Sequence, residues 1–325
     1  MIIDMPNTRT RDISRAIDEL HDERGEAATG RVLTLLISTN EDELEHALEL
    51  ANAASREHPC RVIAISPRRA AAPDATSGAS AEEIAAFEES NLDAQVRFGA
   101  DAGAGEIIVL HPRGGLVHHP DTMVIPLLVP DAPVVAWWPT EAPANPSKDL
   151  LGAMARSRIT DALRSSNPFR TMGDLRRNWS PKNVDMSWTR LTVWRAMLAS
   201  MLDQPPHLPI SAARVTGPAD FLPMDLLAAW LRLKLNVPVT VETIPGANAV
   251  TGVYLTRADG VLSLERPDPE SGTAIISMPG QSPQTISVPA RTLEECLSEE
   301  LRRLDPDEVY AEVITQGWDL IHPTD

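Results

Sequence analysis

Two short apolar runs, joined by an amphipathic helical segment, most constrain what this chain can fold into. Residues 31–38 (RVLTLLIS) and 60–66 (CRVIAIS) are nearly continuous in apolar side chains, with little alternation. Such runs are typical of strands that are covered on both faces, as in parallel sheets. Between them, Thr39 or Asn40 can cap a helix that carries leucine and alanine at helical spacing. The sequence therefore predicts a strand–helix–strand unit of a layered α/β fold.

The remainder of the N-terminal half continues this alternation. The predicted elements are strands at 92–98, 106–111 and 133–138, a kinked helical stretch near 117–129, and a helix from Ser147 to about Leu163. Residues 1–9 are expected to form a loose arm, followed by a helix that runs to about Arg24. The span between the last two strands is long enough for a crossover, so these strands can run parallel.

The C-terminal half begins with a tryptophan-rich helix and then repeats the strand–helix–strand order. The predicted elements are a helix at 188–202, a strand at 210–216, a helix at 221–235, a strand at 239–244, short alternating strands over 249–288, and a helix from about Thr292. Gly260, Gly272 and Gly280 mark turns, which favour an antiparallel meander among the short strands.

Together these patterns predict an α/β protein with two layered halves. We expect a mostly parallel or mixed sheet in the N-terminal half, and a mixed sheet with an antiparallel meander in the C-terminal half. The domain bounds that follow are 1–30 for an N-terminal arm and helix, 31–165 for the first α/β domain, and 185–325 for the second. The length of 325 residues agrees with two domains, at ~150 residues per domain.

The chain is strongly acidic. It has 29 Lys and Arg residues against 46 Asp and Glu residues, which gives a formal net charge of −17 at pH 7. Such a charge repels phosphate backbones and anionic membrane surfaces, so we expect no nucleic-acid and no membrane partner. The apolar runs are far shorter than the ~20 residues of a membrane-spanning helix. Cys60 and Cys296 resemble no disulfide framework, which favours a cytoplasmic location.

No motif in the sequence predicts catalysis, a metal site or a cofactor. Gly99, Gly103 and Gly105 are spaced somewhat like a nucleotide-binding fingerprint, but they precede a strand instead of following one. His118 and His119 are adjacent and point to different faces, which makes them poor joint ligands for a metal. The sequence also lacks the Gly-x-Ser-x-Gly elbow of serine hydrolases. We therefore expect no catalytic residues, no metal and no cofactor.

Arg113, Gly114 and Gly115 form a candidate anion contact. They follow the strand predicted at 106–111, and open α/β sheets bind ligands at strand ends. An arginine beside two glycines can hold a phosphate through its guanidinium and through backbone N–H groups. The same pattern is more often a glycine turn with a solvated arginine, so both interpretations stay open.

Tryptophan and arginine recur together on the helix predicted at 188–202. Trp188 and Arg195 are seven residues apart, which places one above the other on a helix. Arg190 and Trp194 are four residues apart and are also neighbours. An arginine can stack on an indole and still donate hydrogen bonds to a carboxylate. These four residues are candidates for contact with a partner or ligand, and the alternative is a core helix between the domains.

Three further candidate residues for such contact lie upstream. Arg158 and Asp161 are three residues apart within the predicted helix, where they can form an ion pair; the alternative is a solvated helix face. Trp137 and Trp138 end a predicted strand. One indole is expected in the core and the other at the rim, and Trp138 is a candidate contact residue.

Several short segments keep a consistent order across about 30–235. They are His58–Ile63, Pro126–Asp131, Pro133–Trp138, Arg158–Asp161, Trp188–Arg190, Trp194-Arg195 and Ala229–Leu231. Together they resemble the glucose-6-phosphate dehydrogenase assembly proteins, also called oxidative pentose phosphate cycle proteins. The ordered set carries the resemblance, since no single segment is diagnostic.

The resemblance implies a non-catalytic protein that binds glucose-6-phosphate dehydrogenase and promotes its active oligomer in the oxidative pentose phosphate pathway. Such a protein acts as an assembly factor or allosteric activator, and the family supplies no catalytic residues. The alternative from a different class is an α/β enzyme or metabolite sensor that binds a sugar phosphate, with Arg113 as the anion contact.

Overall fold

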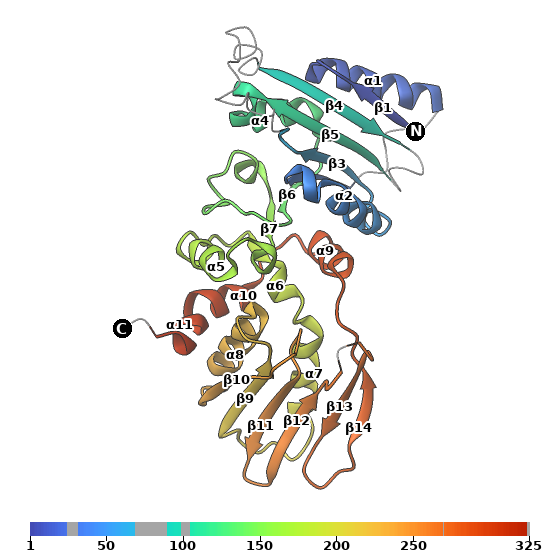
Figure 1. The fold of residues 1–325 in the computed structure, drawn as a ribbon. Helices are drawn as coiled ribbons and strands as arrows, with labels where there is room; N and C mark the ends of the chain where they lie inside the picture. The colour runs from blue at the N-terminus through green and yellow to red at the C-terminus, as the bar shows by residue number, and fades with distance from the viewer. Residues whose placement is uncertain (25–31, 69–89, 99–104, 269, 324–325) are drawn as a thin grey trace. The chain divides into compact units, whose positions relative to one another are not determined.

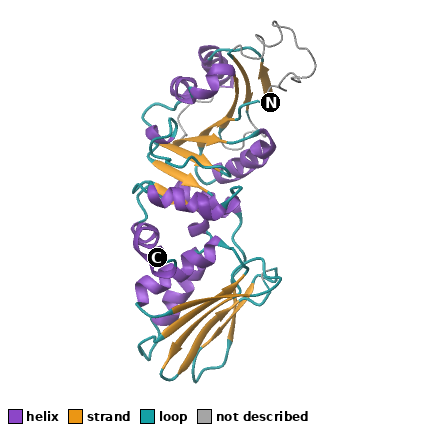
Figure 2. Cartoon of the chain, turned by 60° about the vertical axis from the view of Figure 1, so that its left-hand side comes forward, coloured by secondary structure: helices purple, strands orange, loops and turns teal. Residues whose placement is uncertain are grey.

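The computed structural model describes residues 1–24, 32–68, 90–98, 105–268 and 270–323, in two compact units (Figure 1, Figure 2). Unit 1 consists of Met1–Ser166 and Leu293–Asp305, and unit 2 of Asn167–Thr292 and Pro306–Asp325. The chain thus completes most of unit 2, returns to unit 1 for one helix, and ends in unit 2. The domain bounds expected from the sequence, 31–165 and 185–325, do not include this return.

A mostly parallel sheet forms the centre of unit 1. Its strands are β1 (Ile2–Met5), β2 (Leu33–Ser38), β3 (Cys60–Ile65), β4 (Asn91–Arg97), β5 (Glu106–Arg113), β6 (Val134–Trp138) and β7 (Ser157–Thr160). Within the unit they lie in the order β1-β4-β5-β3-β2-β6-β7. Neighbouring strands from β5 to β7 run parallel, whereas β4 is antiparallel to β5 and β1 to β4.

Helices cover both faces of this sheet. They are α1 (Thr10–Arg24), α2 (Glu41–Ser55), α4 (Pro120–Val124) and α9 (Leu293–Arg302), with 3-10 turns at Gly114–His118, Ile125–Leu127, Gly152–Met154 and Ala162–Arg164. Ile13 and Ile17 of α1 pack in one apolar cluster with Val96, Ile108 and other strand residues. On the opposite face α2 packs against β3, and α9 packs against α2 (Figure 1). This double cover explains why β2 and β3 are apolar at almost every position.

The N-terminal arm is a correction to the sequence prediction. Ile2–Met5 forms β1 instead of a loose arm, and Ile2 lies opposite Arg97 in the antiparallel pair with β4. The amino group of Met1 donates to the carbonyl oxygen of Phe98 at 2.9 Å. The pairing satisfies the outer edge of β4, a requirement that the arm's own sequence does not reveal.

The helix predicted from Ser147 to about Leu163 is also wrong. This region contains turns and then β7, which pairs in parallel with β6 so that Trp137 lies opposite Ile159. Strand formation depends on neighbouring strands more than on local propensity, and β6 supplies that neighbour here.

A mixed sheet forms the second half of the fold, in unit 2. Its strands are β9 (Ala212–Gly217), β10 (Val239–Thr243), β11 (Gly252–Arg257), β12 (Gly260–Glu265), β13 (Thr273–Ser277) and β14 (Gln284–Ser287). Their order is β10-β9-β11-β12-β13-β14, with β9 and β10 parallel and the other pairs antiparallel. Gly260 and Gly272 have φ of +140° and +64°, as expected for glycines at the turns. The predicted α/β class, including the meander, is therefore confirmed.

The helices of unit 2 include one pair that packs unusually closely. The elements are α5 (Pro168–Arg177), the short strand β8 (Asn183–Asp185), α6 (Met186–Thr189), α7 (Thr192–Leu202), α8 (Leu222–Leu235), α10 (Glu308–Glu312), a π-helical turn at Val313–Gly317, and α11 (Trp318–Ile321). Gly317 lies so near α8 that an added Cβ atom would be 2.9 Å from the carbonyl oxygen of Ala229. Glycine is thus required there for the approach of the two backbones.

The helices of both units are short or polar in comparison with membrane spans. Within the described ranges of the chain, none combines the length and the apolar character that spanning a bilayer requires.

Gly317→Ala should destabilise unit 2, because the new methyl group must push α8 away. We expect a loss of about 1–3 kcal/mol in the free energy of unfolding. Gly173→Ala is the matched control, because Gly173 lies in α5 and an added Cβ atom would meet nothing within 4 Å. The control should be neutral or stabilising by up to ~1 kcal/mol, since alanine favours helix. Denaturant titrations that give both variants the same sign of change would contradict this packing.

Candidate functional site

The carboxyl ends of β2 and β6 are the place where a sheet of this order binds ligands. β2 is central, and the chain passes from it to β3 on one side while β6 lies on the other. In open α/β sheets, a crevice forms where the strand order reverses in this way. The residues after β2 and β6 therefore decide whether this protein can hold a nucleotide or a sugar phosphate there.

An acidic helix start occupies this position. The side chain of Asn40 caps α2 by accepting the backbone N–H of Glu43 at 2.9 Å. Glu41, Asp42 and Glu43 then form the first turn of the helix. Phosphates bind at helix N-termini because the N–H groups and the helix dipole attract negative charge, and here three carboxyl groups already use that field. Arg164 forms an ion pair with this first turn, and its Nη1 atom lies 2.7 Å from Oε1 of Glu43.

The glycines considered for nucleotide binding have a packing role where the structure describes them. Gly99 and Gly103 lie outside the described residues, and Gly105 directly precedes β5. A Cβ atom at Gly105 would be 2.1 Å from the carbonyl oxygen of Cys60. This glycine therefore allows two backbones to approach, which agrees with the expectation that the motif is not a nucleotide fingerprint.

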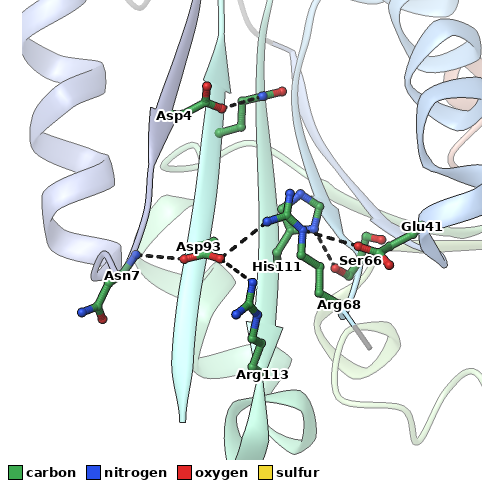
Figure 3. Close-up of polar contacts among 9 residues, drawn as sticks. Asp4, Asn7, Glu41, Ser66, Arg68, Asp93, His111 and Arg113 are labelled. Atoms are coloured by element: carbon green, nitrogen blue, oxygen red, sulfur yellow. Dashed lines mark hydrogen bonds and ion pairs between the residues drawn. The ribbon is translucent and has the colours of Figure 1, made fainter. Parts of the chain in front are cut away.

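A carboxylate on β4 organises the polar side chains at the same edge of the sheet (Figure 3). Asp93 accepts the Nη2–H of Arg113 at 2.9 Å and the backbone N–H of Asn7 at 2.9 Å. Nη1 of Arg68 lies 3.5 Å from the same carboxylate. We call Asp93, Asn7, Arg68 and Arg113 the Asp93 network. It gives both arginines a counterion from within the chain.

The candidate anion contact at Arg113, Gly114 and Gly115 lies in this network. Gly114 has a φ of +56°, and the backbone N–H of Gly115 donates to Oγ of Ser90 at 3.1 Å. The guanidinium donates to Asp93. Two of the donors proposed for an anion, Nη2 of Arg113 and the backbone N–H of Gly115, are thus engaged by acceptors of the chain itself, and an anion contact here stays a prediction.

His111 faces Asp93 across the β4–β5 pair and is buried. Its Nδ1 atom lies 2.9 Å from the carbonyl oxygen of Ser66. Burial lowers the pKa of His111 and outweighs the hydrogen bond to Ser66, which raises it. The imidazole is therefore held in its neutral form at neutral pH.

Within the described ranges, acidic, histidine and cysteine side chains do not converge on a metal centre. In the part of the chain that the structure describes, no group of three such residues has an arrangement that could hold a metal ion.

Arg158 and Asp161 are placed differently from the sequence expectation. Arg158 lies on β7 with only 5% of its surface exposed, and Asp161 follows the strand and is also buried. Nη1 of Arg158 donates to the carbonyl oxygens of Gly152 and Ala155 at 3.1 and 3.4 Å. Neither the helical spacing behind the predicted ion pair nor a solvated helix face is present. Arg158 instead fixes the loop that joins β6 to β7.

Trp138 is a second correction. Both Trp137 and Trp138 are buried, at 1% and 3% exposure, so neither indole lies at the rim. Because adjacent strand residues point to opposite faces, this follows from the helical cover on both faces of the sheet. A role of Trp138 in partner contact stays a prediction. The buried indole would act through the loop that joins β6 to β7, because it lies against Gly152 in that loop.

The tryptophan-rich helix of unit 2 is broken but keeps its predicted stacking. α6 ends at Thr189 and α7 begins at Thr192, so the single helix predicted at 188–202 is interrupted. The guanidinium carbon of Arg195 nevertheless lies 3.8 Å from the centre of the Trp188 ring. At this distance the cation attracts the ring's negative face. The stacking predicted from the seven-residue spacing is thus confirmed.

Asp307 completes what we call the Trp188 cluster, which consists of Trp188, Arg195, Asp307 and Tyr310. The indole N–H of Trp188 donates to Oδ2 of Asp307 at 3.1 Å. Oδ1 of the same carboxylate accepts the backbone N–H of Tyr310 at 2.8 Å and so caps α10. The rings of Trp188 and Tyr310 are 5.9 Å apart. Within unit 2, the cluster therefore ties the C-terminal helices to α6 and α7.

The other two candidates on these helices differ in burial. Trp194 is buried, and the guanidinium carbon of Arg266 lies 5.4 Å from its ring centre. Arg190 is half-buried at the junction of α6 and α7, where its backbone N–H bonds to Met186. No pattern in the sequence indicates the position of Arg266. Asp307 was detectable in principle, because it follows the Asp305-Pro306 break and stands at a helix start.

Two family models match the chain in consecutive order. The glucose-6-phosphate dehydrogenase subunit N-terminal domain matches residues 51–177, and the corresponding C-terminal domain of the same family matches residues 181–314. A comparison with curated proteins finds no match.

The fold and these matches define a two-unit α/β protein of the class associated with glucose-6-phosphate dehydrogenase. The chain belongs to the glucose-6-phosphate dehydrogenase assembly protein family. The resemblance seen in the sequence is therefore confirmed over both halves.

His111 should make the stability of unit 1 depend on pH. Its folded-state pKa lies below the ordinary value of 6.5, so the unfolded chain takes up a proton first as the pH falls. The contribution to stability is present above 6.5 and is lost as the pH falls through the lower folded-state pKa. His111→Asn keeps a donor for Ser66 but does not titrate. Denaturant titrations should show a smaller loss on acidification in the variant, and equal losses would contradict the assignment.

Arg195→Ala should destabilise unit 2 by about 1–2 kcal/mol, because it exposes the buried face of Trp188 and removes a cation–π contact. Arg170→Ala is the control, since Arg170 is exposed on α5. It should stay within about ±0.5 kcal/mol. Thermal unfolding monitored by tryptophan fluorescence separates the two variants. Equal melting temperatures would show that the stack contributes nothing.

Proposed function

We propose that this chain binds glucose-6-phosphate dehydrogenase and supports its active oligomer, without catalysing a reaction of its own. The observation that carries the proposal is the ordered match of both family domains over 51–177 and 181–314. The function is thus an association with the dehydrogenase as an assembly factor and allosteric activator in the oxidative pentose phosphate pathway.

The carboxyl edge of the unit 1 sheet supports a non-catalytic role. A dehydrogenase or kinase on such a sheet needs an anion-binding loop after β2. Here the loop leads into three carboxyl groups, and Arg164 is paired with Glu43. The sugar-phosphate alternative gains no support from Arg113, because its guanidinium already has Asp93 as its partner.

The half-buried arginines near the Trp188 cluster are our candidates for the contact surface. On a chain with a net charge of −17, positive groups are scarce and can select an acidic patch on a partner. Arg190 and Arg195 keep part of their surface exposed, whereas Trp188 and Trp194 are buried, and Trp188 lies beneath Arg195. We therefore assign the arginine heads to binding and the indoles to support.

Activation requires that the chain prefer one state of the enzyme. A partner shifts an equilibrium only by the difference between its affinities for the two states. If the active oligomer exposes a surface that its dissociated protomers lack, binding to that surface stabilises the oligomer.

The cysteines support a cytoplasmic setting and give no redox switch in this proposal. Cys60 and Cys296 are both buried and form no disulfide with each other. Burial raises the pKa of the Cys60 thiol to about 12, so it stays protonated and unreactive.

The direct test titrates the chain into its cognate dehydrogenase and follows NADP reduction with glucose 6-phosphate. The rate should rise and saturate, equally with and without reductant, and the chain alone should reduce no NADP. A rate that stays unchanged across a wide excess of the chain would contradict the proposal.

The same titration tests the contact surface through a charge-reversal variant. Arg190→Glu should raise the concentration of chain needed for half-activation at least tenfold, because a reversed charge at a desolvated contact weakens binding. Arg170→Glu is the matched control, because it makes the same change at an exposed residue of α5. Equal titration curves for the two variants, with equal melting temperatures, would show that the contact surface lies elsewhere.

A further inference from the structure

Strand β10 is an open edge of the unit 2 sheet. It pairs with β9 on one side and ends the strand order on the other. Four of its five residues are exposed, and Val241 in its centre has 45% of its surface exposed. An exposed edge rich in β-branched residues is a template for pairing with another strand.

The free backbone groups of this edge can be assigned from the ladder. The carbonyl of Pro238 accepts from Ala213, and the N–H of Ile244 donates to Gly217, so the even-numbered residues face β9. In a parallel pair the alternate residues point the other way. The N–H and C=O groups of Val239, Val241 and Thr243 are therefore directed outward. Among the described residues, no backbone hydrogen bond from another element reaches them.

Features that block pairing with another strand lie only at the ends of β10. Pro238 and Pro245 bracket the strand, which restricts pairing to the residues between them. The single charge on the strand, Glu242, forms an ion pair with Arg214 of β9. The centre of the strand has no lysine, proline or bulge of the kind that usually blocks edge pairing.

We propose that β10 pairs with β10 of a second copy of this chain, in antiparallel register centred on Val241. This register places Val239 opposite Thr243, and Val241 opposite its own copy. Every outward residue then meets an outward residue, as the hydrogen-bonded pairs of an antiparallel ladder require. The two exposed Val241 side chains pack on each other, and Glu242 lies opposite the neutral Thr240.

Neighbouring registers fit less well. A shift that centres the pair on Glu242 places two carboxylates directly opposite each other, which is destabilising. A register centred on Thr240 places Thr243 opposite Val237, which lies on the other side of Pro238 and outside the strand. A register shifted by a single residue places the outward backbone groups of one copy opposite backbone groups of the other copy that already bond to β9. The self-complementary register therefore selects a second copy as the occupant.

The opposite edge of the same sheet offers a matched control. β14 also ends the strand order, but its exposed residues are the polar Gln284, Thr285 and Ser287, and its Ile286 is half-buried. It lacks an exposed apolar residue at its centre. We therefore assign pairing to β10 and not to β14.

The test measures the mass of the full chain alone by analytical ultracentrifugation across the micromolar range. A short edge pair buries less area than a standard interface, so association should depend on concentration. The wild type should approach twice 35.4 kDa at the highest concentrations. Val241→Lys should remain at the monomer mass, because two lysines would then lie opposite each other. Thr285→Lys, the control on β14, should associate like the wild type.

The register is tested by mixing two charge variants. Val241→Lys and Val241→Glu should each be monomeric, and their equimolar mixture should recover the dimer, because lysine then faces glutamate across the two-fold axis. Unchanged thermal unfolding would show that both variants fold. A monomeric wild type, a dimeric Val241→Lys, or a mixture that stays monomeric would each overturn the proposal. Because the dehydrogenase is absent, none of these outcomes bears on the proposed function.

Discussion

Strand β2 pairs with β3 on one side and β6 on the other, and unit 1 is built around this central position. Its backbone is satisfied by two parallel partners, and its side chains are buried by helices on both faces. The direction of β2 fixes where α2 starts, and the residues at that start decide what the sheet edge can bind. In this chain they are Asn40 as the cap and three acidic residues behind it. The position after β2 where such a sheet usually binds a phosphate is thus occupied by carboxyl groups.

Several polar side chains in each unit hold the fold together. In unit 1, Asp93 gives Arg113 and Arg68 a counterion, and Arg158 fixes a loop by donating to carbonyl oxygens. In unit 2, Arg195 stacks on Trp188, whose indole N–H reaches a helix cap. A protein that works by presenting a stable surface needs this kind of arrangement, because binding energy is lost when the surface must first be ordered.

The sequence predicted the elements whose signal is local, and it failed where a distant partner decides. The apolar runs of β2 and β3 show burial on both faces, and the seven-residue spacing revealed the stack of Arg195 on Trp188. By contrast, β1 and β7 form because β4 and β6 offer them an edge, which their own residues do not encode. Asp93 was missed as the partner of Arg113 for the same reason, since cross-strand register is invisible in one sequence.

We propose that this chain acts by physical association with glucose-6-phosphate dehydrogenase. The most direct measurement is the mass of the purified dehydrogenase with and without the chain, by light scattering coupled to size-exclusion chromatography. We expect a co-eluting complex whose mass exceeds that of the dehydrogenase alone by whole copies of the 35.4 kDa chain. Two separate peaks, each with the mass of its free protein at every ratio tested, would contradict it.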